Sequence, residues 1–305
     1  CEDSLGKQPV AVQWRRKCFP VWRHLLRSVS TRSSSSSAAK SVPLELVFGL
    51  ERERSIKAAK HVNLFLEGTT AVVELSDQQR FNIFSFDLGQ DTRIAVMRLQ
   101  TLATVQSVVL QGAGAHLSAG GNPYSTEGVT QTMSTYSNML RGLYAGFVRL
   151  RALQRFVAGA AHGTAIGGGV AACMHTDFLV AEQSSRFEHG NLVRGVCPLG
   201  MLSRTFVLAL GKQNALSVYL MNSLVDAPTA RAMELCAAIQ TGVKAAQAHA
   251  RSAATSAVLP PLLGFRTPVD PMLRVREAIC HSECQMVNRG MTKSAVTRND
   301  MAPDA

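Results

Sequence analysis

Two glycine-rich turns, each lying between an apolar run and a helical pattern, constrain the fold of this chain more than any other feature. The first is VVLQGAGAHLSAGGN at residues 108–122, and the second is VAGAAHGTAIGGGVAACMH at residues 157–175. Glycine lets the main chain approach a ligand closely and adopt a positive φ. The first turn of a helix also leaves its N–H groups without intrahelical partners. Two such turns directed at one place would therefore bind an oxyanion.

The pattern around these turns predicts alternating strands and helices from about residue 45 onward. Apolar runs rich in β-branched residues predict strands, and near-helical spacing of apolar residues predicts helices. The expected strands cover 70–76, 105–112, 155–163 and 177–182, and the expected helices cover 87–104 and 131–153. Residues 200–251 are expected to be mostly helical, and the alanine-rich stretch 236–254 to run on as helix. The fold class is therefore α/β.

Known glycine motifs do not account for either turn. Gly112 and Gly114 are followed by Leu117, which breaks the G-x-G-x-x-G spacing of dinucleotide-binding folds. The chain has no G-x-x-x-x-G-K-[ST] of a P-loop and no G-x-S-x-G nucleophile elbow. Oxyanion binding by backbone N–H groups and tight packing alone are the two interpretations that stay open.

Basic charge is concentrated at the N-terminal end of the chain. Residues 1–60 hold 12 Lys or Arg against 5 Asp or Glu, in a chain whose formal net charge is +11. Residues 1–44 are rich in Arg and Ser and are predicted to be a disordered extension, either a plastid or mitochondrial transit segment or a linker. Because the chain begins with Cys, we expect a fragment or a processed product. The rest has no basic stripe with interleaved aromatics, so nucleic-acid binding is not expected.

Cysteine usage favours a reducing compartment, the cytoplasm or an organelle. The seven cysteines are scattered and form no C-x-x-C. Cys280 and Cys284 in CHSEC lie four apart on a predicted helix, but no second ligand cluster completes a tetrahedral metal site. We expect neither a metal nor a cofactor. No apolar run reaches the length of about 18 residues that spans a bilayer, so no membrane span is expected.

Taken together, three blocks resemble the enoyl-CoA hydratase/isomerase (crotonase) family in order and spacing. They are 108–122, 157–204 and LVDAPTARAMEL at 224–235. GGNPYS and FEHGNLVRGVCPLGM are further similar to the hydratase-like enzymes associated with polyketide synthases, which act on carrier-bound acyl groups during β-branching. The resemblance implies a crotonase-type spiral of ββα units with a helical C-terminal region, usually a homotrimer or hexamer. We predict a crotonase-like core over 45–254 and a C-terminal helical region and tail over 255–305.

The resemblance also implies an oxyanion hole for an acyl-CoA or acyl-carrier-protein thioester. By motif position its two backbone N–H donors belong to Gly121 and Gly168, and Ala119, Gly120 and Gly167 would contact the substrate. Such a hole stabilises an enolate.

Both glutamates that the family's hydratases use are replaced in this chain. The position two residues after the triple glycine is Ala171, and the position four residues after Phe187 is Asn191. Neither side chain can accept a proton near neutral pH, so hydration by a carboxylate pair is not expected. Decarboxylation, dehydration and isomerisation stay open. A non-catalytic protein that binds acyl thioesters or serves assembly is the alternative.

Other polar side chains near the turns are candidates for substrate contact or proton transfer, with surface, subunit-contact or loop roles as alternatives. They are Tyr124, Glu127, Glu188, His189 and Asn191.

Four further residues and one segment are expected to be structural. His116 and His162 precede glycines, and His175 and Asp177 are expected to cap a helix end and a strand start. Residues 273–291 are predicted to form a helix that docks on a neighbouring subunit.

Overall fold

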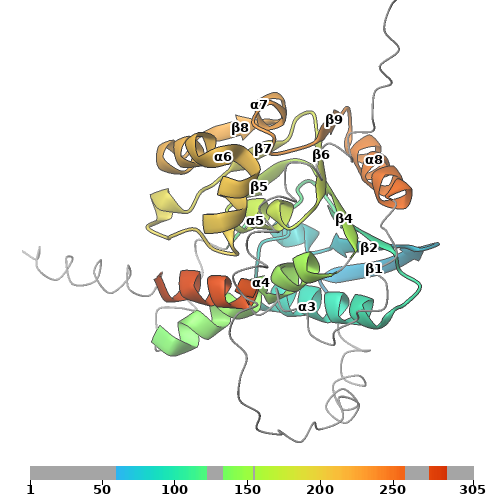
Figure 1. Ribbon diagram of the computed structural model, residues 1–305, viewed down its shortest axis with the longest axis horizontal. Helices are drawn as coiled ribbons and strands as arrows, with labels where there is room; N and C mark the ends of the chain where they lie inside the picture. The colour runs from blue at the N-terminus through green and yellow to red at the C-terminus, as the bar shows by residue number, and fades with distance from the viewer. Residues whose placement is uncertain (1–59, 122–132, 154, 258–274, 287–305) are drawn as a thin grey trace, which may run out of the picture. The chain divides into compact units, whose positions relative to one another are not determined.

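The computed structural model describes residues 60–121, 133–153, 155–257 and 275–286 (Figure 1). The predicted extension over 1–44 and the predicted tail beyond 286 lie outside the described residues. The boundaries of the three predicted regions therefore stay predictions.

A six-stranded sheet carries both glycine turns. Its strand order is β1-β2-β3-β4-β6-β9. β1 and β2 pair antiparallel, and every other neighbouring pair is parallel. The strands are β1 (Val62–Glu67), β2 (Thr70–Leu75), β3 (Ser107–Gly112), β4 (Phe156–Ala161), β6 (Phe178–Glu182) and β9 (Ala238–Gln240). Since parallel neighbours end at the same edge, the turns that follow β3 and β4 leave the sheet side by side.

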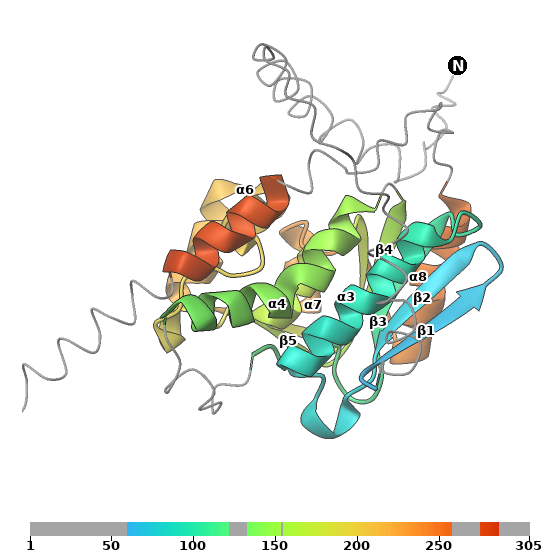
Figure 2. The same cartoon turned by 90° about the horizontal axis from the view of Figure 1, so that it is seen from below.

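Helices cover both faces of this sheet, which explains why every residue of β3 is buried (Figures 1 and 2). On one face Val108 and Leu110 belong to the core that contains the α3 and α4 side chains. On the other face Val109 packs in a second cluster with Ala246 and Ala250 of α8. The covering helices are α3 (Phe86–Thr101), α4 (Met133–Ala152) and α8 (Val243–Ser256).

A second, three-stranded sheet completes the ββα repeats. Its order is β5-β7-β8. Twice a strand of the large sheet is followed by a strand of the small sheet and then by a helix, first as β4-β5-α5 and then as β6-β7-α6. The added elements are β5 (Thr164–Ile166), α5 (Gly168–Met174), β7 (Arg186–Glu188), α6 (Leu202–Met221), β8 (Leu224–Asp226) and α7 (Ala227–Ala232). This order confirms the α/β spiral with a helical C-terminal region.

The prediction that 236–254 runs on as helix is confirmed from Val243 onward, within α8, and was wrong for the residues before it. Ala238–Gln240 instead form β9, in which Ala238 pairs with Val180 of β6 at the edge of the large sheet. Gly242 then takes a φ of +90° and turns the chain into α8. Pairing with an open sheet edge thus outweighs the helix propensity of the alanines.

The predicted C-terminal helix is present over residues 275–286 and packs within the same chain. It is the red ribbon beside α4 in Figures 1 and 2. Glu277 of this helix forms an ion pair with Arg149 of α4 at 3.2 Å. The buried carboxylate of Glu283 accepts hydrogen bonds from Met201 N at 2.6 Å, from Ser203 N at 3.1 Å and from the Ser203 hydroxyl. α6 has no side-chain cap of its own, so Glu283 serves as its N-terminal cap from a distant part of the chain.

Glu283→Ala is expected to lower the free energy of unfolding by about 3 kcal/mol, because it leaves buried donors at the start of α6 without an acceptor. Urea denaturation measures the change. Glu277→Ala is the matched control, since it removes an ion pair at the surface of the same helix and should cost less than about 1 kcal/mol. Equal losses in the two variants would contradict the capping role.

Candidate active site

The first glycine turn is held by the segment between β2 and α3. Ala119 N donates to Phe81 O at 3.0 Å, and Phe84 N donates to Gly120 O at 2.8 Å. Gly120 has a φ of +82°, which an L side chain rarely adopts. Since the Gly120 carbonyl and the Gly121 N–H share one trans peptide plane, the bond from Phe84 directs the Gly121 N–H the opposite way.

The second glycine turn joins β5 to α5. Gly167 has a φ of +48° and precedes the helix, and its N–H donates to Glu188 O at 3.0 Å. Its carbonyl accepts from Ala171 N at 2.9 Å, which is the first turn of α5. The N–H of Gly168 lies in the same peptide plane as this carbonyl and therefore points out of the helix start.

The two turns lie against each other, as the glycine pattern predicted. Ser118 forms a bridge with Ala165, and Ile166 N donates to Ser118 O at 3.4 Å. A Cβ on Gly120 would lie 2.1 Å from Ile166 O and 3.4 Å from the Gly168 nitrogen. No side chain fits between the turns, so glycine is required at the contact.

One backbone N–H on each of these adjoining turns has no partner in the part of the chain that the structure describes. Within the described residues, neither the N–H of Gly121 nor that of Gly168 donates to a protein acceptor. Gly121 is exposed and Gly168 is buried. Each of the two adjoining turns thus carries one backbone N–H without a protein partner among the described residues.

Aromatic side chains from α4 and from the segment before α3 line the space beside Gly168. A Cβ on Gly168 would lie 2.4 Å from a ring carbon of Phe84 and 3.2 Å from the Tyr144 hydroxyl oxygen. The two rings meet edge to face, with centroids 6.0 Å apart. Tyr144 is not among the candidates predicted from the sequence, because it lies within the helix predicted over 131–153 and carries no motif of its own.

Ala171 and Asn191 both lie next to Gly167 of the second turn. Ala171 is fully buried, and a Cβ on Gly200 would lie only 3.1 Å from its methyl group. Asn191 donates from Nδ2 to Cys197 O at 2.9 Å, and its Oδ1 would lie 3.0 Å from a Cβ on Gly167. Of the two positions predicted for the hydratase glutamates, the first thus holds a tightly packed methyl group and the second holds an anchored amide.

The side chains of Glu188 and His189 contact residues other than those of the two glycine turns. Glu188 accepts from Asn222 Nδ2 at 3.0 Å and lies 3.5 Å from Arg194. The His189 ring is buried and meets the rings of Phe206 and Tyr219 on α6. Burial lowers the pKa of His189 to about 4. The backbone carbonyl of Glu188 contacts the second turn, where it accepts the bond from Gly167 N.

Lowering the pH from 7 to 5 is expected to reduce the free energy of unfolding. Burial lowers the pKa of His175 to about 3 and that of His189 to about 4, from an ordinary value of 6.5. Both rings stay neutral in the fold while the unfolded chain takes up protons, so stability is lost as the pH falls from 6.5 toward these values. The loss by pH 5 is about 2 kcal/mol per histidine.

Urea denaturation at several pH values measures this dependence. His189→Phe keeps an aromatic ring between Phe206 and Tyr219 but removes the titrating imidazole. The free energy of unfolding should therefore depend less steeply on pH in this variant. The same slope in the variant and the parent would contradict the assignment to His189.

The residues expected to be structural take such roles. His116 Nδ1 accepts from Thr164 N at 2.9 Å, and His162 Nε2 contacts Gly114 O at 3.0 Å, so both rings bind backbone around the first turn. His175 follows α5 and contacts Gly200 O at 3.0 Å. Asp177 accepts from Val157 N at 3.0 Å at the start of β6.

Tyr124 and Glu127 lie outside the described residues, so their candidate roles stay predictions. In the described ranges no group of three or more His, Cys, Asp or Glu side chains could hold a metal ion. Cys280 and Cys284 are buried in the core. Among the residues that the structure describes, no helix is long and apolar enough to cross a membrane.

Known proteins resemble this chain in sequence. The putative enoyl-CoA hydratase of Thermus thermophilus is 29% identical over 171 residues, which cover 55% of this chain and 67% of the relative. The short-chain-enoyl-CoA hydratase of Clostridium acetobutylicum is 26% identical over 54% of this chain and 69% of its own length.

Solved structures share the architecture. A putative enoyl-CoA hydratase/isomerase from Acinetobacter baumannii has a TM-score of 0.62 at 22% identity, covering 75% of this chain and 98% of that structure. A putative enoyl-CoA hydratase from Thermobifida fusca, solved with acetoacetyl-CoA, has a TM-score of 0.59 at 17% identity, covering 80% and 96%. Residues 66–262 match the family described as enoyl-CoA hydratase/isomerase. This chain is therefore a member of the enoyl-CoA hydratase/isomerase family.

Proposed function

We propose that this protein is an enzyme that binds an acyl thioester, carried by CoA or by an acyl carrier protein, and stabilises its enolate. The observation that carries the proposal is the contact between two glycine turns whose N–H groups, at Gly121 and Gly168, lack protein partners among the described residues. Ala119, Gly120 and Gly167 shape the backbone around the bound thioester. A relative named for short-chain enoyl-CoA and a structural neighbour solved with acetoacetyl-CoA support a thioester ligand.

The proposed reaction is decarboxylation, and dehydration and isomerisation are the alternatives. In decarboxylation the bond to the carboxylate carbon breaks, carbon dioxide leaves, and the electron pair moves onto the thioester oxygen between the two N–H groups. A proton from water or a side chain then restores the neutral thioester. This step needs no base, which suits a site with Ala171 and Asn191 at the glutamate positions. The other two reactions need a proton carrier.

The test follows from the similarity to polyketide β-branching enzymes. Purified protein is incubated with 3-hydroxy-3-methylglutaryl and 3-methylglutaconyl thioesters in CoA and carrier-protein forms, and products are identified by mass spectrometry. Formation of a dehydrated or decarboxylated thioester supports the proposal. Absence of product from all four substrates would overturn the β-branching assignment, and tight binding without turnover would favour the non-catalytic alternative.

We further propose that the chain assembles with copies of itself into a trimer or hexamer. Large apolar side chains are exposed along α6 and just after it, at Leu208, Leu220, Met221 and Leu224. Exposed patches of this kind mark association surfaces. Sedimentation velocity measures the assembly, and a monomer at micromolar concentration would overturn this proposal.

A further inference from the structure

We propose that Ser118 is a positioning residue that holds the two N–H groups of the thioester site at a fixed separation, with Asn82 as its support. This inference rests on the proposed function, because it assigns a role within the same site. Ser118 lies just before the first glycine turn and is fully buried, as is Asn82. Neither residue is one of the groups proposed to touch the substrate.

Ser118 contacts both turns at once. Its hydroxyl accepts from Gly120 N at 3.2 Å, which fixes the peptide before the proposed donor Gly121. Its carbonyl accepts from Ile166 N at 3.4 Å, two residues before Gly168. A Cβ on Gly169 would lie 2.3 Å from the same carbonyl oxygen. A displacement of Ser118 would therefore move one N–H group relative to the other.

Asn82 anchors the Ser118 hydroxyl. The hydroxyl donates to Asn82 O at 2.6 Å, so its proton is committed there and a lone pair faces Gly120 N. Asn82 takes a φ of 52°, a conformation that asparagine tolerates better than most residues. The asparagine backbone thus presents its carbonyl to Ser118.

Both the nitrogen and the oxygen of the Asn82 side-chain amide form hydrogen bonds. Nδ2 donates to Ala113 O at 2.9 Å and to His116 O at 2.8 Å, and Oδ1 accepts from Asp77 N at 2.7 Å. The amide therefore ties the segment after β2 to the loop after β3. A buried side chain with this many bonds has one rotamer available, which makes it a rigid support for the turn.

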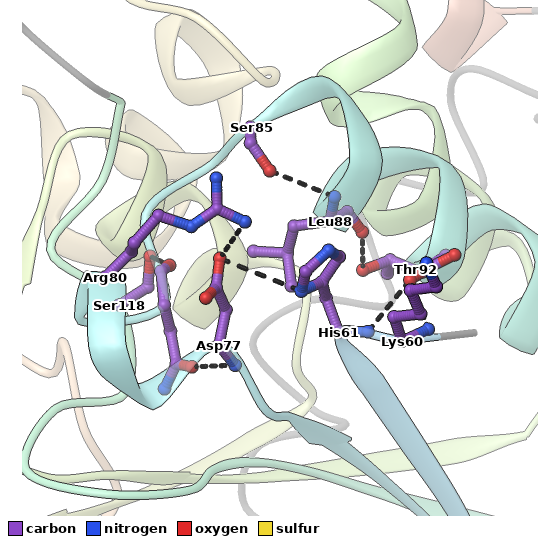
Figure 3. A network of polar contacts seen from close by, with 10 residues as sticks. Lys60, His61, Asp77, Arg80, Ser85, Leu88, Thr92 and Ser118 are labelled. Carbon is purple, nitrogen blue, oxygen red and sulfur yellow. Dashed lines mark hydrogen bonds and ion pairs between the residues drawn. The ribbon is translucent and has the colours of Figure 1, made fainter. Parts of the chain in front are cut away.

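The network continues to the buried Asp77 and ends at the exposed side chain of Arg80. Figure 3 shows the Asp77 carboxylate beside Arg80, at 2.8 Å, and beside His61, at 3.9 Å. Ser85 lies in the same view but belongs to a separate contact, in which its hydroxyl caps α3 by accepting from Leu88 N at 3.2 Å. Ser85 thus offers a serine with an ordinary capping role close to the proposed site.

The experiment compares Ser118→Ala with Ser85→Ala in the full chain. Ser118→Ala loses two hydrogen bonds of a buried hydroxyl and Ser85→Ala loses one of a half-buried hydroxyl. Thermal unfolding should therefore show a larger loss of stability in Ser118→Ala, and it checks that both variants are folded at the assay temperature. The probe is acetyl-CoA with ¹³C at the thioester carbonyl, and the readout is the infrared stretch of that carbonyl when bound. The parent and Ser85→Ala should shift it equally to lower wavenumber, and Ser118→Ala should lose most of the shift.

The turnover of the thioester substrate gives a second readout. Ser118→Ala should lower kcat about 10- to 100-fold with little change in KM. A misplaced donor weakens the stabilisation of the transition state more than the binding of the substrate. Ser85→Ala should keep both constants.

The outcomes separate the two proposals. A parent protein that binds acetyl-CoA without any carbonyl shift, or does not bind it, would overturn the proposed function, and the role of Ser118 with it. A shifted carbonyl in the parent that is equally shifted in Ser118→Ala would overturn only the positioning role.

Discussion

Gly121→Pro is expected to lower turnover of the thioester substrate about 10²- to 10³-fold, which is the usual effect of losing one oxyanion donor. Proline removes the N–H and leaves the carbonyl of Gly121 in place. The backbone at Gly121 has no positive φ, and no described heavy atom lies within 4 Å of a Cβ built there. The substitution therefore removes the donor, and its Cβ meets no described heavy atom.

Gly121→Ala is the matched control for this experiment. Alanine adds the same Cβ but keeps the N–H, so kcat should stay within about threefold of the parent, far above the loss expected from a missing donor. Circular dichroism of all three proteins checks that each is folded. An equal fall in kcat for alanine and proline would contradict a role of the N–H and indicate a steric effect.

The second large effect is expected from reinstating the hydratase glutamates. The double variant Ala171→Glu, Asn191→Glu should remain unable to hydrate crotonyl-CoA and should lose about 4 kcal/mol of unfolding free energy. The Ala171 methyl group is fully buried and lies against Gly200, so a carboxylate there would be forced into packed surroundings. Asn191 would also lose its bond to Cys197 O.

Ala171→Gln, compared with Ala171→Glu alone, separates the two causes of the loss at this position. Glutamine has the length of glutamate without the charge, so it should recover part of the lost stability if desolvation of the carboxylate contributes and none if crowding alone acts. The loss of enoyl absorbance measures hydration. A double variant that hydrates crotonyl-CoA would contradict the account, because it would mean that the site retains the space and geometry of a two-glutamate hydratase.

The sequence predicted the parts of the fold that depend on local pattern. The buried run at Ser107–Gly112 and the strand at Thr70–Leu75 were expected within a few residues, as was the helix at Phe86–Thr101. These segments carry a strong period or a β-branched apolar run. The strand at Ala238–Gln240 was missed because alanine-rich sequence favours helix, and only the open edge beside β6 makes it a strand.

The site was predictable where glycine itself is the signal. Gly120 and Gly167 have positive φ, and side chains at either would clash or strain the turn. Ser118 and Asn82 carried no such signal, because their roles depend on hydrogen bonds between segments that are 36 residues apart in the chain. Glu283 was missed for the same reason, since it caps α6 across 80 residues or more.

The most direct test of the central claim is a crystal structure of the protein with acetyl-CoA, in which the position of the thioester oxygen is measured. The account predicts that this oxygen accepts from Gly121 N and Gly168 N together, each at about 2.9 Å. A well-defined acetyl-CoA whose carbonyl oxygen lies away from both nitrogens would contradict it.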